Sequence, residues 1–334
     1  MISGNIGLHD APVDDVAIVI PVFNDWESLS MLLTEIDATL GTANLKGRIT
    51  VVDDGSSAPI PDLLRRQTYQ HLSQLEVVRL SVNQGHQRAI AIGIAHLNQQ
   101  HTAATYVVVM DGDGEDRADH IPRLFDELTR QNRSVVFGAR TQRSEGNLFR
   151  LMYAVFRLFY RLLTGASIRF GNFSAMRSAV LPALSTCPDL WNHYAAAVVR
   201  SRLTYGTVPL ARGKRYKGES RMGYIGLIAH GLSSISVFAD IVGTRLMIFF
   251  SGLLACEAIL IAVEIALRPE LSHRFFLHAI DATGILILFS LQSLLISLLF
   301  TLAQLGGRSS AKVVPSREAP EFVLCVEQLF PDQL

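Results

Sequence analysis

Two long apolar segments near the C-terminal end most constrain what this chain can fold into. Residues 246–267 read LMIFFSGLLACEAILIAVEIAL, and residues 284–303 read GILILFSLQSLLISLLFTLA. At a rise of about 1.5 Å per residue, each would form a helix roughly 30 Å long, which matches the hydrocarbon thickness of a bilayer. We therefore predict two membrane-spanning helices, and the alternative is a pair of helices buried in a soluble core.

The first apolar segment contains two acidic residues, Glu257 and Glu264, whereas the second contains no charge. Carboxylates are costly in lipid, so they are expected to face protein or a water-filled path. Their spacing of seven residues places both on one face of a helix. We expect this face to point toward the second span, toward another subunit or toward a substrate path.

The basic residues around the spans favour one orientation only modestly. Arg245 precedes the first span, Arg308, Lys312 and Arg317 follow the second, and Arg268 and Arg274 lie between them. The first 15 residues contain no basic stretch leading into an apolar run, so we expect no export signal. The sequence thus predicts a two-span protein of the inner or plasma membrane, with its N-terminal region and its tail both cytoplasmic.

Composition excludes some classes of function. Thirty basic and 30 acidic side chains give a formal charge of zero, which offers no support for nucleic-acid binding. Cys187, Cys256 and Cys325 lie far apart and outside any zinc-ligand spacing. We interpret them as free thiols in a reducing compartment.

The N-terminal two thirds of the chain has the pattern of an α/β domain. Apolar, β-branched runs predict strands at residues 16–22, 48–54, 75–80, 105–111 and 134–138. Helical stretches lie between them at residues 26–40, 61–72, 84–98 and 120–130. Alternating strands and helices indicate a parallel-rich sheet covered on both faces, in which ligands bind beyond the carboxyl ends of the strands.

Acidic clusters follow three of these strands. The clusters are PVFND at residues 21–25, VDDGSS at residues 52–57 and DGDGED at residues 111–116, while NQGHQRA follows the third strand at residues 83–89. A single cluster could be a turn or a helix cap, and for DDGSS alone that interpretation is equally good. Three clusters at one sheet edge, without a phosphate-binding GKS or GKT loop, predict a divalent cation held together with a nucleotide.

The order IPVFND, VVDDGSS, NQGHQRAIAIGI and MDGDGED resembles the family 2 glycosyltransferases, which have a GT-A fold. With its two apolar segments the chain is similar, over about residues 15–305, to polyprenyl-phosphate glycosyltransferases of the dolichyl-phosphate mannose synthase type. The resemblance implies that Asp111 and Asp113 form the DxD pair and that Glu115 also approaches the metal. Mg²⁺ or Mn²⁺ would bridge these catalytic carboxylates and the donor diphosphate, which they would otherwise repel.

The same resemblance implies a nucleotide site. Its residues would be Pro21, Phe23, Asp25, Asp53, Asp54, Gly85 and Asp111. Asp25 and Phe23 stand where the family pattern PVYNE has Glu and Tyr.

Basic residues supply candidate phosphate contacts. The segment FGARTQR resembles the family's GSRxxR pattern, so Arg140, as a catalytic residue, and Arg143 would contact phosphate. The segment ARGKRYKGESRM resembles RxxGxSK, which implies that Arg215, Ser220 and Arg221 bind the lipid phosphate or the donor diphosphate.

A basic stripe follows the fifth predicted strand. Arg143, Arg150, Arg157 and Arg161 would share one face of a continuous helix that is otherwise rich in aromatic and aliphatic residues. Such a helix is typical of a membrane interface. The alternative is a solvated arginine face on a helix packed against the core.

One departure from the family pattern concerns the acceptor. Asn172 stands where these enzymes commonly have the Asp of an Asp-Phe pair. A phosphate acceptor is mostly ionised at pH 7 and needs little base catalysis, whereas a hydroxyl acceptor needs a carboxylate base. No base is assigned, although Asp113, Glu115 and Asp116 lie near. The QxxRW pattern of processive synthases is absent, which favours transfer of one sugar per turnover.

Together these features predict an inverting, metal-dependent glycosyltransferase that uses a nucleotide-sugar donor and a polyprenyl-phosphate acceptor at the bilayer. The alternatives are transfer to a lipid or glycan hydroxyl and a catalytically silent nucleotide-binding scaffold, and a homo-oligomer stays open. The expected organisation is a flexible N-terminus at 1–15, a GT-A domain at 16–221, juxtamembrane helices at 222–245, two spans within 246–305 and a tail at 306–334.

Overall fold

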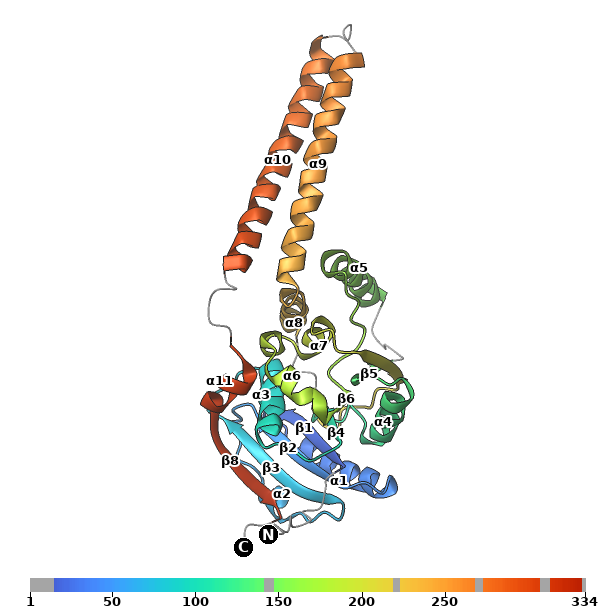
Figure 1. The fold of residues 1–334 in the computed structure, drawn as a ribbon, viewed down its shortest axis with the longest axis vertical. Coiled ribbons are helices and arrows are strands. Elements are labelled where there is room, and N and C mark those ends of the chain that lie inside the picture. Colours follow the sequence, from blue (N-terminus) through green and yellow to red (C-terminus); the bar gives the residue numbers. More distant parts are fainter. Residues whose placement is uncertain (1–14, 141–146, 219–222, 268–272, 307–312, 332–334) are drawn as a thin grey trace, which may run out of the picture. The chain divides into compact units, whose positions relative to one another are not determined.

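The computed structural model describes residues 15–140, 147–218, 223–267, 273–306 and 313–331. The chain forms two compact units. The first comprises Met1–Glu145, Ile168–Val237 and Val313–Leu334, and the second comprises Gly146–Ser167 and Phe238–Lys312. The first unit is an α/β domain, and the second consists of helices (Figure 1).

The α/β unit is built on a single mixed sheet with the strand order β7-β5-β6-β4-β1-β2-β3-β8. The strands are β1 (Val16–Val22), β2 (Gly47–Asp53), β3 (Leu72–Leu80), β4 (Tyr106–Val109), β5 (Val135–Arg140), β6 (Ser174–Arg177), β7 (Tyr205–Leu210) and β8 (Val323–Phe330). Strands β3, β2, β1 and β4 are parallel, while β6 and β8 are antiparallel to their neighbours. All five predicted strands are present.

Helices cover both faces of the sheet, as the continuous apolar strands predict. Val16, Ile18 and Ile20 of β1 pack into the core on the side of α1 (Trp26–Thr42) and α4 (Ile121–Arg130). The alternate residues Ala17 and Val19 pack into the core on the side of α3 (His86–Gln99), α6 (Leu181–Ser185) and α7 (Tyr194–Arg200). Strand β1 is buried along its whole length.

The register of the sheet determines which loops meet at the site. Val22 at the end of β1 pairs with Asp53 at the end of β2, and Val19 pairs with Val109 at the end of β4. The loops that follow these three strands therefore leave the sheet at the same edge. This edge bears the three acidic clusters.

One predicted helix is shorter than expected. The sequence predicts a helix over residues 61–72, but α2 covers only Asp62–Arg66. The reason is a tertiary contact: the carboxylate of Asp37 in α1 accepts the backbone N–H groups of Gln70, His71 and Leu72. These hydrogen bonds fix the chain in an extended form that leads into β3.

The segment after the second apolar helix returns to the α/β unit. It forms α11 (Pro315–Phe322), which packs against α3, and β8, which pairs antiparallel with β3 at the edge of the sheet. Arg65 of α2 and Glu327 of β8 form an ion pair. The sequence assigned no role to this tail, and in the structure it is part of the sheet.

The second unit contains α5 (Asn147–Thr164), α9 (Ala239–Leu267) and α10 (His273–Gly306). Helices α9 and α10 lie side by side and contain the candidate membrane spans Ala239–Val263 and Thr283–Gln304, each with a mean hydropathy of 2.4 (Figure 1). Only 6% and 17% of the two most apolar windows are buried, so these are not helices of a soluble core.

Two features of this unit bear on the sequence predictions. Glu257 is only 6% exposed, and its Oε1 accepts a hydrogen bond of 3.0 Å from Ser290 of α10, so it points toward the second span. The side chain of Glu264 lies outside the described residues.

Helix α5 packs against α9 and exposes Phe156, Phe159 and Leu162. The helix begins at Asn147, and Arg143 of the predicted basic stripe lies outside the described residues.

Candidate active site

The loops after β1 and β2 are joined by hydrogen bonds. Asn24 accepts the backbone N–H groups of Ser57 and Ala58 at 2.9 and 3.0 Å, and its own N–H donates to Ser56 Oγ at 2.8 Å. Phe23 beside it keeps 42% of its surface exposed, whereas Pro21 is buried within β1. The phenyl ring of Phe23 is thus presented at the sheet edge.

The two aspartates that end β2 tie the edge together. Asp53 is buried, accepts the N–H of Ser56 at 2.9 Å and lies 3.2 Å from Arg79 Nε. Asp54 accepts the N–H groups of Gln84 and Gly85 at 2.6 and 3.0 Å, and burial raises the pKa of its carboxyl. The predicted nucleotide residues Asp53, Asp54 and Gly85 therefore lie together.

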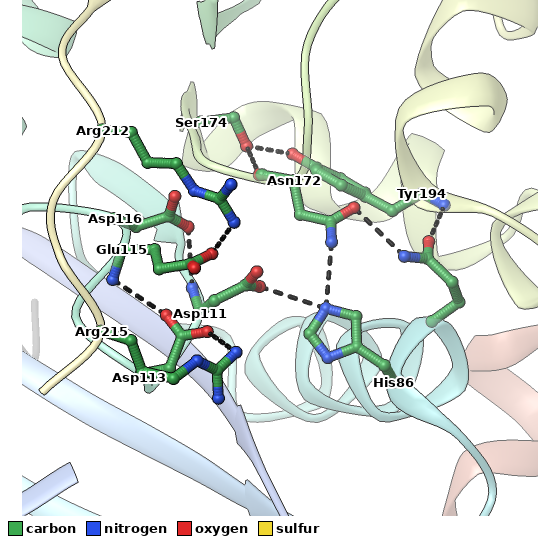
Figure 2. Close-up of polar contacts among 11 residues, drawn as sticks. His86, Asp111, Asp113, Glu115, Asp116, Asn172, Ser174, Tyr194, Arg212 and Arg215 are labelled. Atoms are coloured by element: carbon green, nitrogen blue, oxygen red, sulfur yellow. Dashed lines mark hydrogen bonds and ion pairs between the residues drawn. The ribbon is translucent and has the colours of Figure 1, made fainter. Parts of the chain in front are cut away.

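The carboxylates after β4 form the centre of the site (Figure 2). Asp111 Oδ1 lies 3.1 Å from His86 Nε2, and the Asp111 N–H donates to the buried Asp116 at 2.9 Å. Asp113 accepts the N–H of Glu115 through Oδ1 at 2.9 Å and pairs with Arg215 Nη2 through Oδ2 at 2.6 Å. Asp116 therefore fixes the turn, and Asp111 and Asp113 face the sheet edge.

The basic segment 212–217 lies directly against this acidic loop. The N–H groups of Gly213 and Tyr216 donate to the carbonyl oxygens of Glu115 and Asp113 at 2.8 and 3.0 Å. Arg212 forms an ion pair with Glu115 (Figure 2). Sequence reasoning missed Arg212, and the only available signal was its membership of the basic segment.

Asn172 belongs to a second polar chain that reaches Asp111 (Figure 2). The Tyr194 N–H donates to Gln87 Oε1 at 2.7 Å. This bond orients the Gln87 amide so that its Nε2 donates to Asn172 Oδ1 at 3.2 Å. Asn172 Nδ2 then lies 3.0 Å from His86 Nε2. The sequence identified Asn172 only as a departure from a pattern. In the structure the side chain of His86 lies between Asn172 and Asp111, the first carboxylate of the DxD pair.

A shallow hollow adjoins the carboxylates. Its walls include Glu115, Asp116, Arg117, His120, Phe173 and Arg212. Burial lowers the pKa of His120, so its imidazole is neutral at pH 7 and offers one donor and one acceptor. With both signs of charge balanced across the hollow, its lining suits a polar, uncharged group.

A model of the glycosyl transferase family 2 matches residues 17–184, about half of the chain, and these residues contain both the sheet edge and its carboxylates. The chain belongs to glycosyl transferase family 2. It is a glycosyltransferase with the α/β architecture of the GT-A enzymes, as the sequence motifs predicted.

The glycosyltransferase resembles enzymes with named lipid acceptors. It is 30% identical over 222 residues to the undecaprenyl-phosphate 4-deoxy-4-formamido-L-arabinose transferase of Edwardsiella ictaluri (strain 93-146), and the match spans 64% of each chain. The enzyme of the same name from Klebsiella pneumoniae (strain 342) is 26% identical over 280 residues, which cover 78% of this chain and 79% of that one. Among solved structures, glucosyl-3-phosphoglycerate synthase from Mycobacterium tuberculosis with Mn²⁺, UDP-glucose and phosphoglyceric acid has a TM-score of 0.49 and 16% identity, over 69% of this chain and 80% of that one.

The donor set of the glycosyltransferase fits a hard divalent cation. Burial and the nearby charge of Asp111 raise the pKa of Asp113, against the opposing effect of Arg215 and Arg212. Two carboxylates that repel each other in this way are stabilised when a cation binds between them. Within the described residues no three His, Cys, Asp or Glu side chains are arranged to hold a metal ion.

The remaining predicted site residues fall into two groups. Asp25 lies 3.9 Å from Arg215, close to the carboxylates. Arg140 ends β5, but its side chain is outside the described residues, as are Arg143, Ser220 and Arg221 altogether.

Proposed function

We propose that this glycosyltransferase transfers a single sugar, with inversion, from a nucleotide-diphosphate sugar to a polyprenyl phosphate. The observation that carries the proposal is the pairing of Asp113 with Arg215 and of Glu115 with Arg212 at the sheet edge of a chain that also contains two candidate membrane spans. Acidic groups suit a cation, and guanidinium groups suit phosphate. The names of the undecaprenyl-phosphate transferases support the same acceptor class.

The donor nucleotide would bind over the ends of β1, β2 and β4. The exposed ring of Phe23 offers an apolar face to the base, and Asp25, Asp53 and Asp54 line the same edge. Asp53 and Asp54 are already bound by backbone N–H groups, so their main contribution is to hold the loops that contact the nucleoside.

In the reaction an oxygen of the lipid phosphate attacks the anomeric carbon, and the bond from this carbon to the donor diphosphate breaks. A bound Mg²⁺ or Mn²⁺ would supply positive charge that stabilises the departing nucleoside diphosphate. Asp111 and Asp113 would hold it, with Glu115 beside them. Arg215, Arg212 and Arg140 would hold phosphate oxygens in line. The acceptor phosphate is already ionised, so Asn172 in place of an acid does not hinder its attack.

The proposed site of action is the cytoplasmic face of the inner or plasma membrane. The segments before α9 and after α10 both belong to the α/β unit, which is consistent with a hairpin whose two ends emerge on the same side of the bilayer. Helix α8 (Tyr224–Ser236), which precedes the first span, exposes Leu227, Ile228 and Leu232. An exposed apolar face next to a span favours contact with the lipid surface.

A direct assay tests the proposal. Purified full-length protein in detergent, supplied with undecaprenyl phosphate and a panel of radiolabelled nucleotide sugars with Mn²⁺, should form one labelled lipid. Loss of labelling with Asp113→Ala is expected. A labelled product that lacks the phosphate link by mass would indicate a hydroxyl acceptor, and donor binding without any transfer would refute the proposed activity.

A further inference from the structure

The basic segment 212–217 is fastened to the acidic loop by its backbone. Hydrogen bonds from Gly213 N to Glu115 O and from Tyr216 N to Asp113 O hold the two loops side by side. Gly114 has φ +87°, and a Cβ there would lie 2.2 Å from the ring of Tyr216. The fit leaves little freedom for the backbone, so any rearrangement here falls to side chains.

Three basic side chains of this segment pair with acids. Arg215 pairs with Asp113, and Arg212 pairs with Glu115 (Figure 2). Arg215 also lies 3.9 Å from Asp25, and Lys217 pairs with Glu27 at 2.8 Å. The Asp113–Arg215 pair is partly buried, with 13% and 23% of the two side chains exposed. The pair of Lys217 and Glu27 is exposed at the rim.

Both oxygens of Asp113 are engaged by this arrangement. Oδ1 accepts the Glu115 N–H, which the turn holds in place, and Oδ2 accepts Arg215. A cation that binds Asp113 must therefore compete with the guanidinium of Arg215, which pairs with Oδ2 and lies at the end of a long, rotatable side chain. At Glu115 one oxygen, Oε2, is paired with an arginine, Arg212.

We infer that Arg215 and Arg212 are exchange partners of the cation site: they pair with Asp113 and Glu115 before the donor binds, and they move to the donor diphosphate when the carboxylates take the cation. The inference rests on the proposed function and concerns the order in which this site is filled. The exchange replaces two carboxylate–guanidinium pairs by carboxylate–cation and guanidinium–phosphate pairs. No partly buried charge is left without a partner at either end of the process, which avoids the penalty for an uncompensated charge. The planar guanidinium suits both partners because it binds carboxylate and phosphate with the same fork of N–H groups.

The exchange has a consequence that simple binding lacks. Arginine competition weakens the binding of the cation alone, whereas the same arginines strengthen binding of the diphosphate. Removal of Arg215 should therefore change the two affinities in opposite directions. A residue that binds phosphate without pairing with a cation carboxylate would change the affinity for cation alone only through the weaker, salt-screened effect of its charge.

The experiment measures Mn²⁺ binding to the full-length protein in detergent by electron paramagnetic resonance of free Mn²⁺. With Arg215→Gln, the affinity for Mn²⁺ alone should rise about three- to tenfold, the range expected for release of one partly exposed ion pair. Affinity for UDP or GDP at saturating Mn²⁺ should fall at least about tenfold, as for loss of a charged hydrogen bond to phosphate. Arg212→Gln should show the same pair of changes and provides the test if Arg215→Gln does not fold.

Lys217→Gln is the matched control, because it removes one positive charge from the same segment without touching a cation carboxylate. It should change Mn²⁺ affinity less than about twofold, which is a long-range effect weakened by salt. If Arg215→Gln and Arg212→Gln bind Mn²⁺ no more tightly than Lys217→Gln, the exchange is refuted while the proposed function stands. If the wild-type protein binds no Mn²⁺ even with UDP or GDP, the metal dependence of the proposed function fails, and the exchange fails with it.

Discussion

At the scale of single residues, Gly114 decides whether the acidic loop and the basic segment can approach each other. Its φ of +87° lies in the left-handed region, and the ring of Tyr216 packs where a side chain would begin. A Cβ at this position would meet ring atoms at 2.2–2.6 Å. Glycine is therefore required twice, once for the backbone conformation and once for the space.

We expect Gly114→Ala to lower the free energy of unfolding by more than about 2 kcal/mol, since left-handed strain and a steric clash add together. It should also weaken Mn²⁺-dependent nucleotide binding, because Asp113 and Arg215 would move apart. Gly218→Ala is the control: Gly218 has φ +73° but nothing within 4 Å of its Cβ position, so only the strain of about 1–2 kcal/mol remains. Chemical denaturation and isothermal titration calorimetry check both variants, and equal losses in the two would show that the contact with Tyr216 is unimportant.

At the scale of secondary-structure elements, a buried polar cluster joins β2, β3 and α3. Glu76 of β3 is buried, and it accepts hydrogen bonds from Thr50 at 2.7 Å and Gln100 at 3.1 Å and lies 3.1 Å from His96 Nε2. Burial alone would raise the pKa of Glu76. The pairing with His96 and the hydrogen bonds from Thr50 and Gln100 outweigh burial, and the pKa is lowered.

This lowered pKa predicts how stability depends on pH. A carboxyl whose pKa is lower in the folded than in the unfolded state stabilises the protein above its unfolded value, about 4.5, and this contribution disappears as the pH falls through the folded value. We expect the free energy of unfolding to decline from pH 5 downward, and to decline less steeply in Glu76→Gln. Urea unfolding between pH 3 and pH 7 provides the measurement. Identical slopes in the two proteins would mean that other carboxylates determine the acid sensitivity.

The hairpin of α9 and α10 offers a prediction about Glu257. Its Oε1 accepts a hydrogen bond from Ser290, while its Oε2 has no hydrogen-bond partner in the part of the chain that the structure describes. Of the three roles that the sequence left open, contact with the second span is the one with a hydrogen bond to support it. We expect Glu257→Gln to keep this bond, to change hairpin stability by less than about 1 kcal/mol and to leave turnover unchanged. Thermal unfolding in detergent and the transfer assay check this, and a strong loss of turnover would instead support a role in a substrate path.

The elements also show why sequence reasoning succeeded where it did. Strands β1, β2 and β4 are continuous apolar runs that end in Asp-rich loops, so both their burial and the edge they share follow from local pattern. Strands β6 and β8 are short or partly exposed, and their pairing depends on partners far away in the sequence. Likewise, Asp111 and Asp113 are visible in a motif, but the pairing of Arg212 with Glu115 and of His86 with Asp111 exists only in the folded chain.

At the scale of the whole molecule, the tail requires that the chain cross a bilayer an even number of times between β3 and β8, if it crosses one at all. Strand β8 pairs with β3 of the α/β unit, and β3 precedes both candidate spans in the sequence. If α9 and α10 span the bilayer, they must do so as a hairpin, because β8 and β3 cannot pair across a membrane. The hairpin is required whatever the weak bias in basic residues.

The natural cysteines allow this topology to be tested. Cys325 is exposed on β8, whereas Cys256 lies within the first candidate span. A membrane-impermeant maleimide should label Cys325 in inverted membrane vesicles and leave it unlabelled in intact cells, since we expect the α/β unit to be cytoplasmic. Cys187→Ser and Cys256→Ser in the same chain leave Cys325 as the single reporter. A cysteine added to this variant between α9 and α10, with Cys325→Ser, should show the reverse pattern, because a hairpin places its loop on the opposite side. Labelling of both positions from the same side would exclude a spanning hairpin, and the two apolar helices would then have to lie on the membrane surface or pack against another protein.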